Sequence, residues 1–226
     1  MITGSGARIA AITIAVLLTA TVLGYVALRE YRTHAVHGVV TALVAETSGR
    51  LRDALAGDSR AAPAEAARRL DDQADEIDQR LAALHRLRPA PDRALVDVAD
   101  LYMVTARELV RRTASSQRYR EALAASTEAL RSLAATADRR SGAWIARAIA
   151  AKERAEGDYS DYRRALDATA SLLDSLAESR DRLARKVDPA SVIEEELRAQ
   201  AANRTRAAAK QAADALDQAR RLASRQ

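Results

Sequence analysis

The sequence predicts an all-α protein in which an N-terminal transmembrane helix continues into an elongated, stepped antiparallel helical bundle, or coiled coil, of about five long helices. Three observations support this prediction. Leu and Ala, both strong helix formers, supply most of the apolar residues. Only eight Gly and four Pro occur in 226 residues. After the first apolar run, apolar residues recur at alternating spacings of three and four, which is typical of amphipathic helices that pack together.

The first apolar run, residues 9–28, predicts the transmembrane helix. It has no charged residue and lies between Arg8 and a charged group formed by Arg29, Glu30 and Arg32. About 20 helical residues at about 1.5 Å each reach about 30 Å, the thickness of the hydrocarbon core of a bilayer. A cleaved signal peptide is the alternative, but this run is longer than the roughly 7 to 15 apolar residues of a signal sequence.

The predicted location is therefore the inner (cytoplasmic) membrane, as a single-pass protein. Residues 1–8 form the N-terminal flank, and residues 29–226 form the bundle. Arg8 and the amino terminus carry nearly as much positive charge as Arg29 and Arg32, so charge alone does not set the orientation. We expect a periplasmic bundle because N-terminal anchors commonly have that orientation.

Proline divides the bundle into helices. It is tolerated in the first turn of a helix but costs about 3 kcal/mol in the middle of one. The four prolines, Pro63, Pro89, Pro91 and Pro189, therefore indicate helix boundaries. The predicted helices span residues 29–56, 63–88, 92–139, 142–187 and 189–224, and the first is expected to continue the membrane helix as one rod.

The apolar stripes also predict how the helices pair. A short turn after residue 56 folds the second helix back along the first, with Val44 opposite Ile77. The helices 92–139 and 142–187 have matching stripes and form a hairpin in which Leu95 faces Val187. The third helix would be about 70 Å long, whereas the first two extend only about 40 Å, so the bundle is expected to be stepped.

The expected step lies near Tyr119, where the third helix becomes polar, and it provides the candidate site. Arg112 and Tyr119 face Tyr159 and Tyr162 across the predicted hairpin. Together they would present a guanidinium and phenol hydroxyls to an anionic ligand. The alternative, which the sequence favours, is packing, because amphipathic Tyr and Arg are expected on any rim that two ending helices expose.

Other chemistry finds little support in the sequence. The chain has no Cys, which excludes a disulfide, a thiolate nucleophile and a Cys-ligated metal. Glu30, His34 and His37 share a helical face but lack a further zinc ligand. We therefore predict no catalytic residue, no metal site and no cofactor. The net charge is +5, but basic and acidic residues are interspersed, so no nucleic-acid interface is expected.

The architecture resembles bacterial chemoreceptor-like sensor domains and small membrane-anchored coiled-coil proteins in general layout, and no motif assigns a role to any residue. The predicted function is that of a non-catalytic structural or protein-interaction component of the bacterial cell envelope, with a protein partner or self-association. The alternative is a sensor or ligand-binding bundle that uses its Tyr/Arg layer and signals through a partner. An enzyme would need reactive groups that the sequence does not show.

Overall fold

The computed structural model describes the backbone of residues 4–57, 61–135 and 141–224, and the side chains of residues 21–57, 61–135 and 141–221. These residues form an all-α chain of five long helices, which confirms the predicted fold class at that level. The helices are α1 (Gly4–Ala56), α2 (Pro63–His85), α3 (Arg93–Ala135), α4 (Gly142–Ala184) and α5 (Glu195–Ser224).

Local sequence explains where the helices begin and end. Pro63 is the first residue of α2, where its missing N–H costs nothing. Asp92 accepts a hydrogen bond from the Leu95 N–H at 3.0 Å at the start of α3, and Ser141 caps α4 by accepting from the Trp144 N–H at 3.2 Å. These caps satisfy amide groups that have no partner within the first turn of a helix.

The predicted helix 189–224 begins later than expected. Pro189–Ser191 forms a short 3-10 turn, and α5 starts only at Glu195. The backbone is extended at Val192, and the side chains of Val192 and Ile193 are buried in the core. The extended backbone at this point places both side chains in the core before α5 begins. The helices predicted to end at residues 88 and 187 end at His85 and Ala184, and the helix predicted to end at residue 56 ends there. The end predicted at residue 139 lies outside the described part of the chain, which omits residues 136–140.

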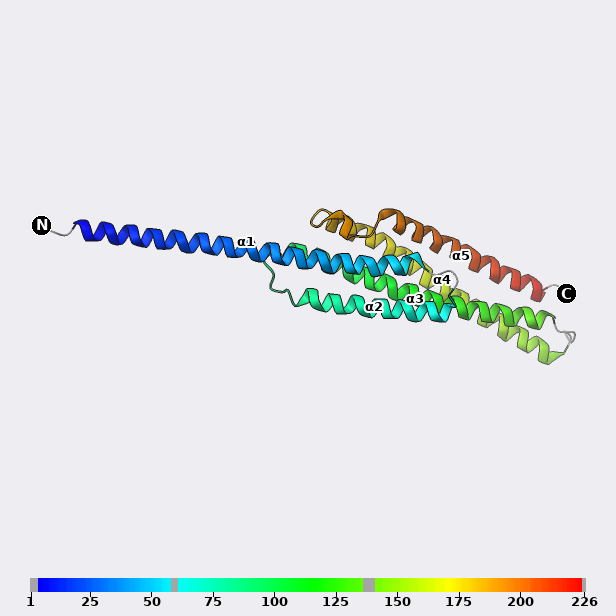
Figure 1. The fold of residues 1–226 in the computed structure, drawn as a ribbon. Coiled ribbons are helices and arrows are strands. Elements are labelled where there is room, and N and C mark those ends of the chain that lie inside the picture. Colours follow the sequence, from blue (N-terminus) through cyan, green and yellow to red (C-terminus); the bar gives the residue numbers. More distant parts are fainter. Residues whose placement is uncertain (1–3, 58–60, 136–140, 225–226) are drawn as a thin grey trace.

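The helices lie side by side in an elongated bundle (Figure 1). α1 ends and α2 begins about halfway along α3, so one half of the bundle contains five helices and the other consists of α3, α4 and α5. Two ion pairs with each neighbour show that α2 runs antiparallel to α1 and to α3. Arg80 contacts Glu46 of α1 at 2.9 Å, and Glu76 contacts Arg50 further along α1. Asp78 contacts Arg107 of α3 at 2.8 Å, and Asp71 contacts Arg118 further along α3. α1 lies against both α3 and α5.

The core follows this division. In the five-helix half, a large apolar cluster takes residues from every helix, and its fully buried members include Ile77, Leu109 and Leu173. In the three-helix half, a smaller cluster consists of Leu123, Tyr162, Leu166 and Ala212. Both clusters exclude water from the apolar stripes that the sequence pattern predicts, and this burial is the main force that holds the bundle together.

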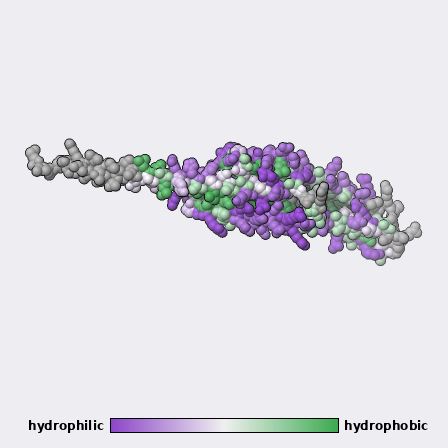
Figure 2. All heavy atoms as spheres, viewed as in Figure 1, coloured by the Kyte–Doolittle hydropathy of each residue, from purple (hydrophilic) through white to green (hydrophobic). Residues whose placement is uncertain are grey.

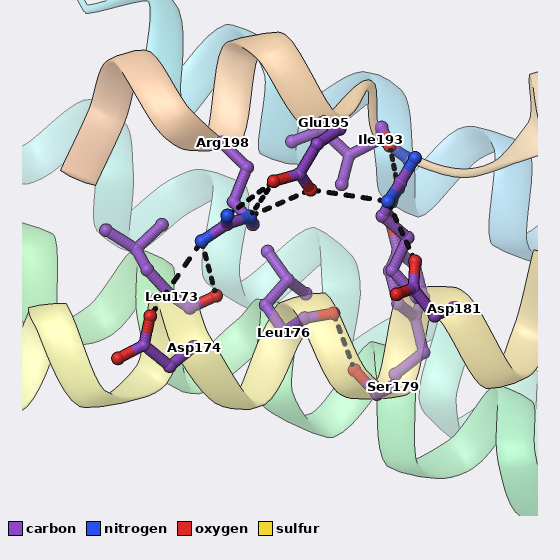
Figure 3. A network of polar contacts seen from close by, with 10 residues as sticks. Leu173, Asp174, Leu176, Ser179, Asp181, Ile193, Glu195 and Arg198 are labelled. Atoms are coloured by element: carbon purple, nitrogen blue, oxygen red, sulfur yellow. Dashed lines mark hydrogen bonds and ion pairs between the residues drawn. The ribbon is translucent and has the colours of Figure 1, made fainter. Parts of the chain in front are cut away.

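Hydrogen bonds and ion pairs hold the start of α5 against α4 (Figure 3). Arg198 of α5 forms an ion pair with Glu195 and donates to the Leu173 carbonyl of α4 at 3.4 Å. Arg180 of α4 donates to the carbonyl of Ile193 at 2.9 Å. Hydrogen bonding to Arg198 lowers the pKa of Glu195, since the guanidinium stabilises the carboxylate. These contacts hold the segment between α4 and α5 against the core.

One buried tyrosine joins three parts of the chain. Tyr102 of α3 is fully buried, its hydroxyl lies 2.8 Å from the Ser48 hydroxyl of α1, and it accepts a hydrogen bond from the Ile193 N–H at 3.2 Å. Burial raises the pKa of Tyr102, so the phenol stays neutral. The Ile193 amide, which lies outside any helix, thereby obtains the partner that a buried amide needs.

The predicted transmembrane helix finds no support in the structure. Among the residues described, no helix is both long enough and apolar enough to cross a bilayer. The side chains of residues 9–28 are described only from Thr21 onwards, and the apolar stretch that follows ends at Arg29, Glu30 and Arg32. This finding contradicts the predicted single-pass location in the inner membrane with a periplasmic bundle.

Candidate functional site: the cavity where α1 ends

The four residues predicted from the sequence do not form one site. Arg112 is exposed and pairs with Glu108 at 2.8 Å within its own helix, and Tyr119 is 39% exposed. Tyr159 is partly buried and packs on the small apolar cluster of the three-helix half. Only Tyr162, which is 5% exposed, lines a cavity. The structure therefore brings Tyr159 and Tyr162 to the same cluster, and separates Arg112 and Tyr119 from the cavity.

The cavity lies at the step, where α1 ends and α2 begins, and has a volume of about 570 Å³. All five helices contribute to its lining. Its apolar part is formed by leucines that also belong to the two clusters: Leu55, Leu70, Leu166 and Leu173. Because α1 stops here, the surfaces of α3 and α5 that it covers in the five-helix half lose their cover.

One wall of the cavity is the end of α1. Gly57 has φ +63°, the left-handed conformation that ends many helices and that favours glycine. Arg204 of α5 donates hydrogen bonds to the carbonyls of Leu55 at 2.5 Å and Ala56 at 2.9 Å. These carbonyls have no partner within α1, and the guanidinium also complements the negative end of the helix dipole. Arg204 thus fixes α1 against α5 at the edge of the cavity.

Hydroxyl groups line the cavity on α3, α4 and α5. Thr113, Thr169 and Thr205 each donate to the carbonyl four residues earlier in their own helix, at distances of 2.8 to 3.0 Å. Ser116 donates in the same way to the carbonyl of Thr113 at 2.8 Å. Each hydroxyl proton is therefore already engaged, and each oxygen keeps a free lone pair.

Arg120 and Tyr162 lie at the boundary between this cavity and a second one of about 360 Å³. Burial raises the pKa of Tyr162, and the nearby charge of Arg120 partly opposes the rise. The phenol is therefore protonated at neutral pH and can donate a hydrogen bond. Arg120 is exposed and has no acidic partner among the described residues.

Two glutamines of the lining have unsatisfied groups. The side-chain oxygens of Gln73 on α2 and Gln117 on α3 are buried, and neither has a hydrogen-bond partner in the described structure. An unpaired buried acceptor costs about 1 to 3 kcal/mol, because it loses its bond to water without replacement. The buried polar groups around the cavity are therefore less completely hydrogen-bonded than those in the rest of the described core.

The residues of α3 that line the cavity follow a regular spacing in the sequence. Thr113, Ser116, Gln117 and Arg120 are spaced i, i+3, i+4 and i+7, so they lie on one face of α3. Arg112 lies at the edge of that face, four residues before Ser116, and its side chain pairs with Glu108 without lining the cavity. The sequence pattern selected Arg112 and Tyr119 from this stretch of α3, and neither of them lines the cavity.

The structure also reveals a contact that the sequence did not indicate. His85 lies 2.7 Å from the Asp100 carboxylate, which also pairs with Arg88 at 3.2 Å. His85 is half exposed, and the pair joins the end of α2 to α3. Among the described residues, no group of three or more His, Asp or Glu side chains is placed to hold a metal ion.

Comparison with known proteins adds no assignment: no family model, no curated protein and no solved structure matches this chain.

Proposed function

We propose that this chain is a non-catalytic helical interaction protein that pairs with a second copy of itself through the projecting part of α1. The observation that supports this proposal is the exposure of large apolar side chains on α1 before it reaches the bundle. Leu23, Tyr25, Leu28 and Tyr31 are 52% to 73% exposed. Figure 2 shows this hydrophobic segment next to the largely hydrophilic surface of the bundle. Exposed apolar patches of this kind are typical of interaction surfaces.

The pattern on this segment fits packing against another helix. Gly24, Leu28, Tyr31 and Ala35 follow each other at spacings of four, three and four, so they form a stripe on one face. The space around Gly24 is open, which lets a second helix approach closely. We call this set the α1 stripe.

A second copy is favoured by the symmetry of the stripe. In an antiparallel pair whose two-fold axis lies between Leu28 and Tyr31, the Leu28 of each copy meets the Tyr31 of the other, and Gly24 meets Ala35. The two-fold pair makes each of these contacts twice. The stripe is therefore complementary to itself in register.

Analytical ultracentrifugation over a concentration series tests the proposal. We expect a reversible dimer, and we expect Leu28→Asp to weaken its Kd by more than about tenfold, because a leucine that is buried on pairing contributes roughly 1.5 to 3 kcal/mol. Leu101→Asp is the matched control, since Leu101 is a leucine on α3 that is 46% exposed, compared with 52% for Leu28. This variant is expected to dimerise like the wild type.

A wild-type chain that stays monomeric at every concentration, or that binds lipid vesicles instead of pairing, would overturn the proposal. Equal dimerisation of the wild type and the Leu28→Asp variant would also overturn it. Because the chain has no Cys, single-cysteine variants provide a second readout. Tyr31→Cys should form a disulfide-linked dimer under mild oxidation, whereas Tyr119→Cys, on the far part of α3, should not.

A further inference from the structure

We infer that the cavity at the end of α1 binds a small organic anion with an apolar body. In this complex the acidic group pairs with Arg120, and the body lies among the leucines of the cavity. The inference does not depend on pairing through the α1 stripe, because the cavity lies within one chain and in a different part of the molecule.

The size and lining of the cavity fit such a ligand. Its volume of about 570 Å³ lies within the range of about 300 to 1,000 Å³ that is usual for small-molecule sites. Leu55, Leu70, Leu166 and Leu173 are each at most 7% exposed and provide the apolar surface. The hydroxyls and charged groups that line the rest of the cavity would then orient the ligand.

The charges at the cavity favour an anion. Its lining includes three guanidinium groups, those of Arg69, Arg120 and Arg204, and one carboxylate, that of Asp53. Arg204 is occupied by the carbonyls at the end of α1, and Arg69 pairs with Glu65 at 2.5 Å. Arg120 is the arginine of this lining without an acidic partner among the described residues, so its N–H groups can bind a carboxylate, sulfonate or phosphate.

Tyr162 places a second donor beside Arg120. The phenol ring is buried, and its hydroxyl has no hydrogen-bond partner within the described structure. The ring lines both cavities, as does Arg120. An acidic group at this boundary would therefore receive hydrogen bonds from a guanidinium and a phenol, while the body of the ligand extends towards α1.

A pair of fluorescent probes tests the inference on the full chain. 8-Anilinonaphthalene-1-sulfonate has a sulfonate on an aromatic body, and N-phenyl-1-naphthylamine has the same body without the sulfonate. We expect the wild type to bind the sulfonate probe more tightly than the neutral one. We expect Arg120→Gln to weaken binding of the sulfonate probe about tenfold and to leave binding of the neutral probe within about twofold, because only the ionic hydrogen bonds are lost.

The matched control is Arg154→Gln. Arg154 is an exposed arginine on α4 that does not line either cavity, and no acidic partner is described for it, so this variant has the same change in net charge. It should bind both probes like the wild type. If Arg120→Gln and Arg154→Gln behave alike, or if Arg120→Gln weakens both probes equally, the inference is wrong.

A second variant separates the cavity from the α1 stripe, to which apolar probes also bind. Ala208 lines both cavities and is partly buried, so Ala208→Trp fills the space next to Tyr162. We expect the Arg120-dependent part of the binding of the sulfonate probe to disappear in this variant, with an unchanged helical circular dichroism spectrum. Unchanged binding of the sulfonate probe by Ala208→Trp would also overturn the inference.

Discussion

α3 passes through both halves of the bundle, and it is surrounded by other helices in only one of them. In the five-helix half, consecutive residues of α3 on several faces are buried, including Tyr102, Met103, Thr105 and Ala106. In the three-helix half, burial is restricted to a single stripe that includes Leu123 and Leu130. The same helix is therefore a central element in one half and an outer element in the other.

The difference between the two halves shows how the end of α1 changes the packing of α3 and α5. α1 covers α3 and α5 up to Ala56, and beyond that residue the same surfaces line cavities. Small and hydroxylated side chains replace large apolar ones at this position, as Ser116 and Ala208 show. Stability is thus concentrated in the five-helix half, and open space for a ligand is concentrated at the step.

A pair of identical substitutions on α3 gives the largest expected effect. Leu109 is fully buried in the five-helix half, whereas Leu123 is 4% exposed in the three-helix half. We expect Leu109→Ala to lower the free energy of unfolding by about 4 kcal/mol and Leu123→Ala by about 2 kcal/mol, because fewer neighbours surround the second site. Urea unfolding followed by circular dichroism measures both values. Equal losses would show that the two halves are packed equally well.

Removal of the Tyr102 hydroxyl tests the buried hydrogen bonds of the five-helix half. Tyr102→Phe leaves the Ile193 N–H without its partner and removes the contact to Ser48. We expect a loss of about 1 to 3 kcal/mol in the free energy of unfolding, the usual cost of an unpaired buried group. Tyr119→Phe is the control, with no expected loss, since Tyr119 is 39% exposed.

The same variant predicts a pH dependence. Burial raises the pKa of Tyr102 above its ordinary value of 10.0, so the folded state holds this proton more tightly than the unfolded state does. The contribution to stability is complete below pH 10 and decreases as the pH rises through the folded pKa. The wild type should therefore lose stability more steeply than Tyr102→Phe above pH 10. Parallel curves for the two proteins would contradict the role of this hydroxyl.

Much of the fold could be predicted because it depends on local rules. Helix boundaries follow from Pro63 and from the caps Asp92 and Ser141, and the buried stripes follow from three-four spacing. The break before α5 could not be predicted in this way. It depends on the burial of Val192 and Ile193 in a core that other helices supply, and on the Tyr102 hydroxyl that accepts from the Ile193 N–H.

The residues that line the cavity could be predicted less completely than the fold, for a geometric reason. The sequence indicated the polar turn of α3, but two faces of that helix are polar there, and Arg112 was selected where Arg120 lines the cavity. Distinguishing the faces requires the rotation of α3 relative to α1, which the lengths of the helices do not give. The contact of Arg204 with the end of α1 could not be predicted, because its partners are backbone carbonyls, which leave no pattern in the sequence.

The glutamines at the cavity provide a smaller and opposite effect. Gln73→Leu removes a buried oxygen without a partner, so we expect it to raise the free energy of unfolding by about 1 kcal/mol. Gln79→Leu is the control, because Gln79 is exposed on the same helix, and its effect should stay within about 0.5 kcal/mol. If Gln73→Leu destabilises the protein, the side-chain amide of Gln73 makes a contact whose loss outweighs the removal of the unpaired oxygen.

The smallest expected effect concerns the tie between α1 and the start of α5 in the five-helix half. Glu194 accepts hydrogen bonds from Arg52 at 2.6 and 3.1 Å, and this contact lowers the pKa of Glu194 below its ordinary value of 4.5. The folded state therefore favours the carboxylate, and the stabilisation is present above pH 4.5 and disappears as the pH falls through the folded pKa. Both side chains are about half exposed, so Glu194→Gln should cost less than about 1 kcal/mol at pH 7. Thermal unfolding at pH 7 and at pH 3 measures the difference, which should shrink at the lower pH, whereas Glu196→Gln, on the exposed start of α5, should change neither value. A difference between wild type and Glu194→Gln that is the same at both pH values would mean that the side chain acts through packing and that this ion pair does not hold α1 to α5.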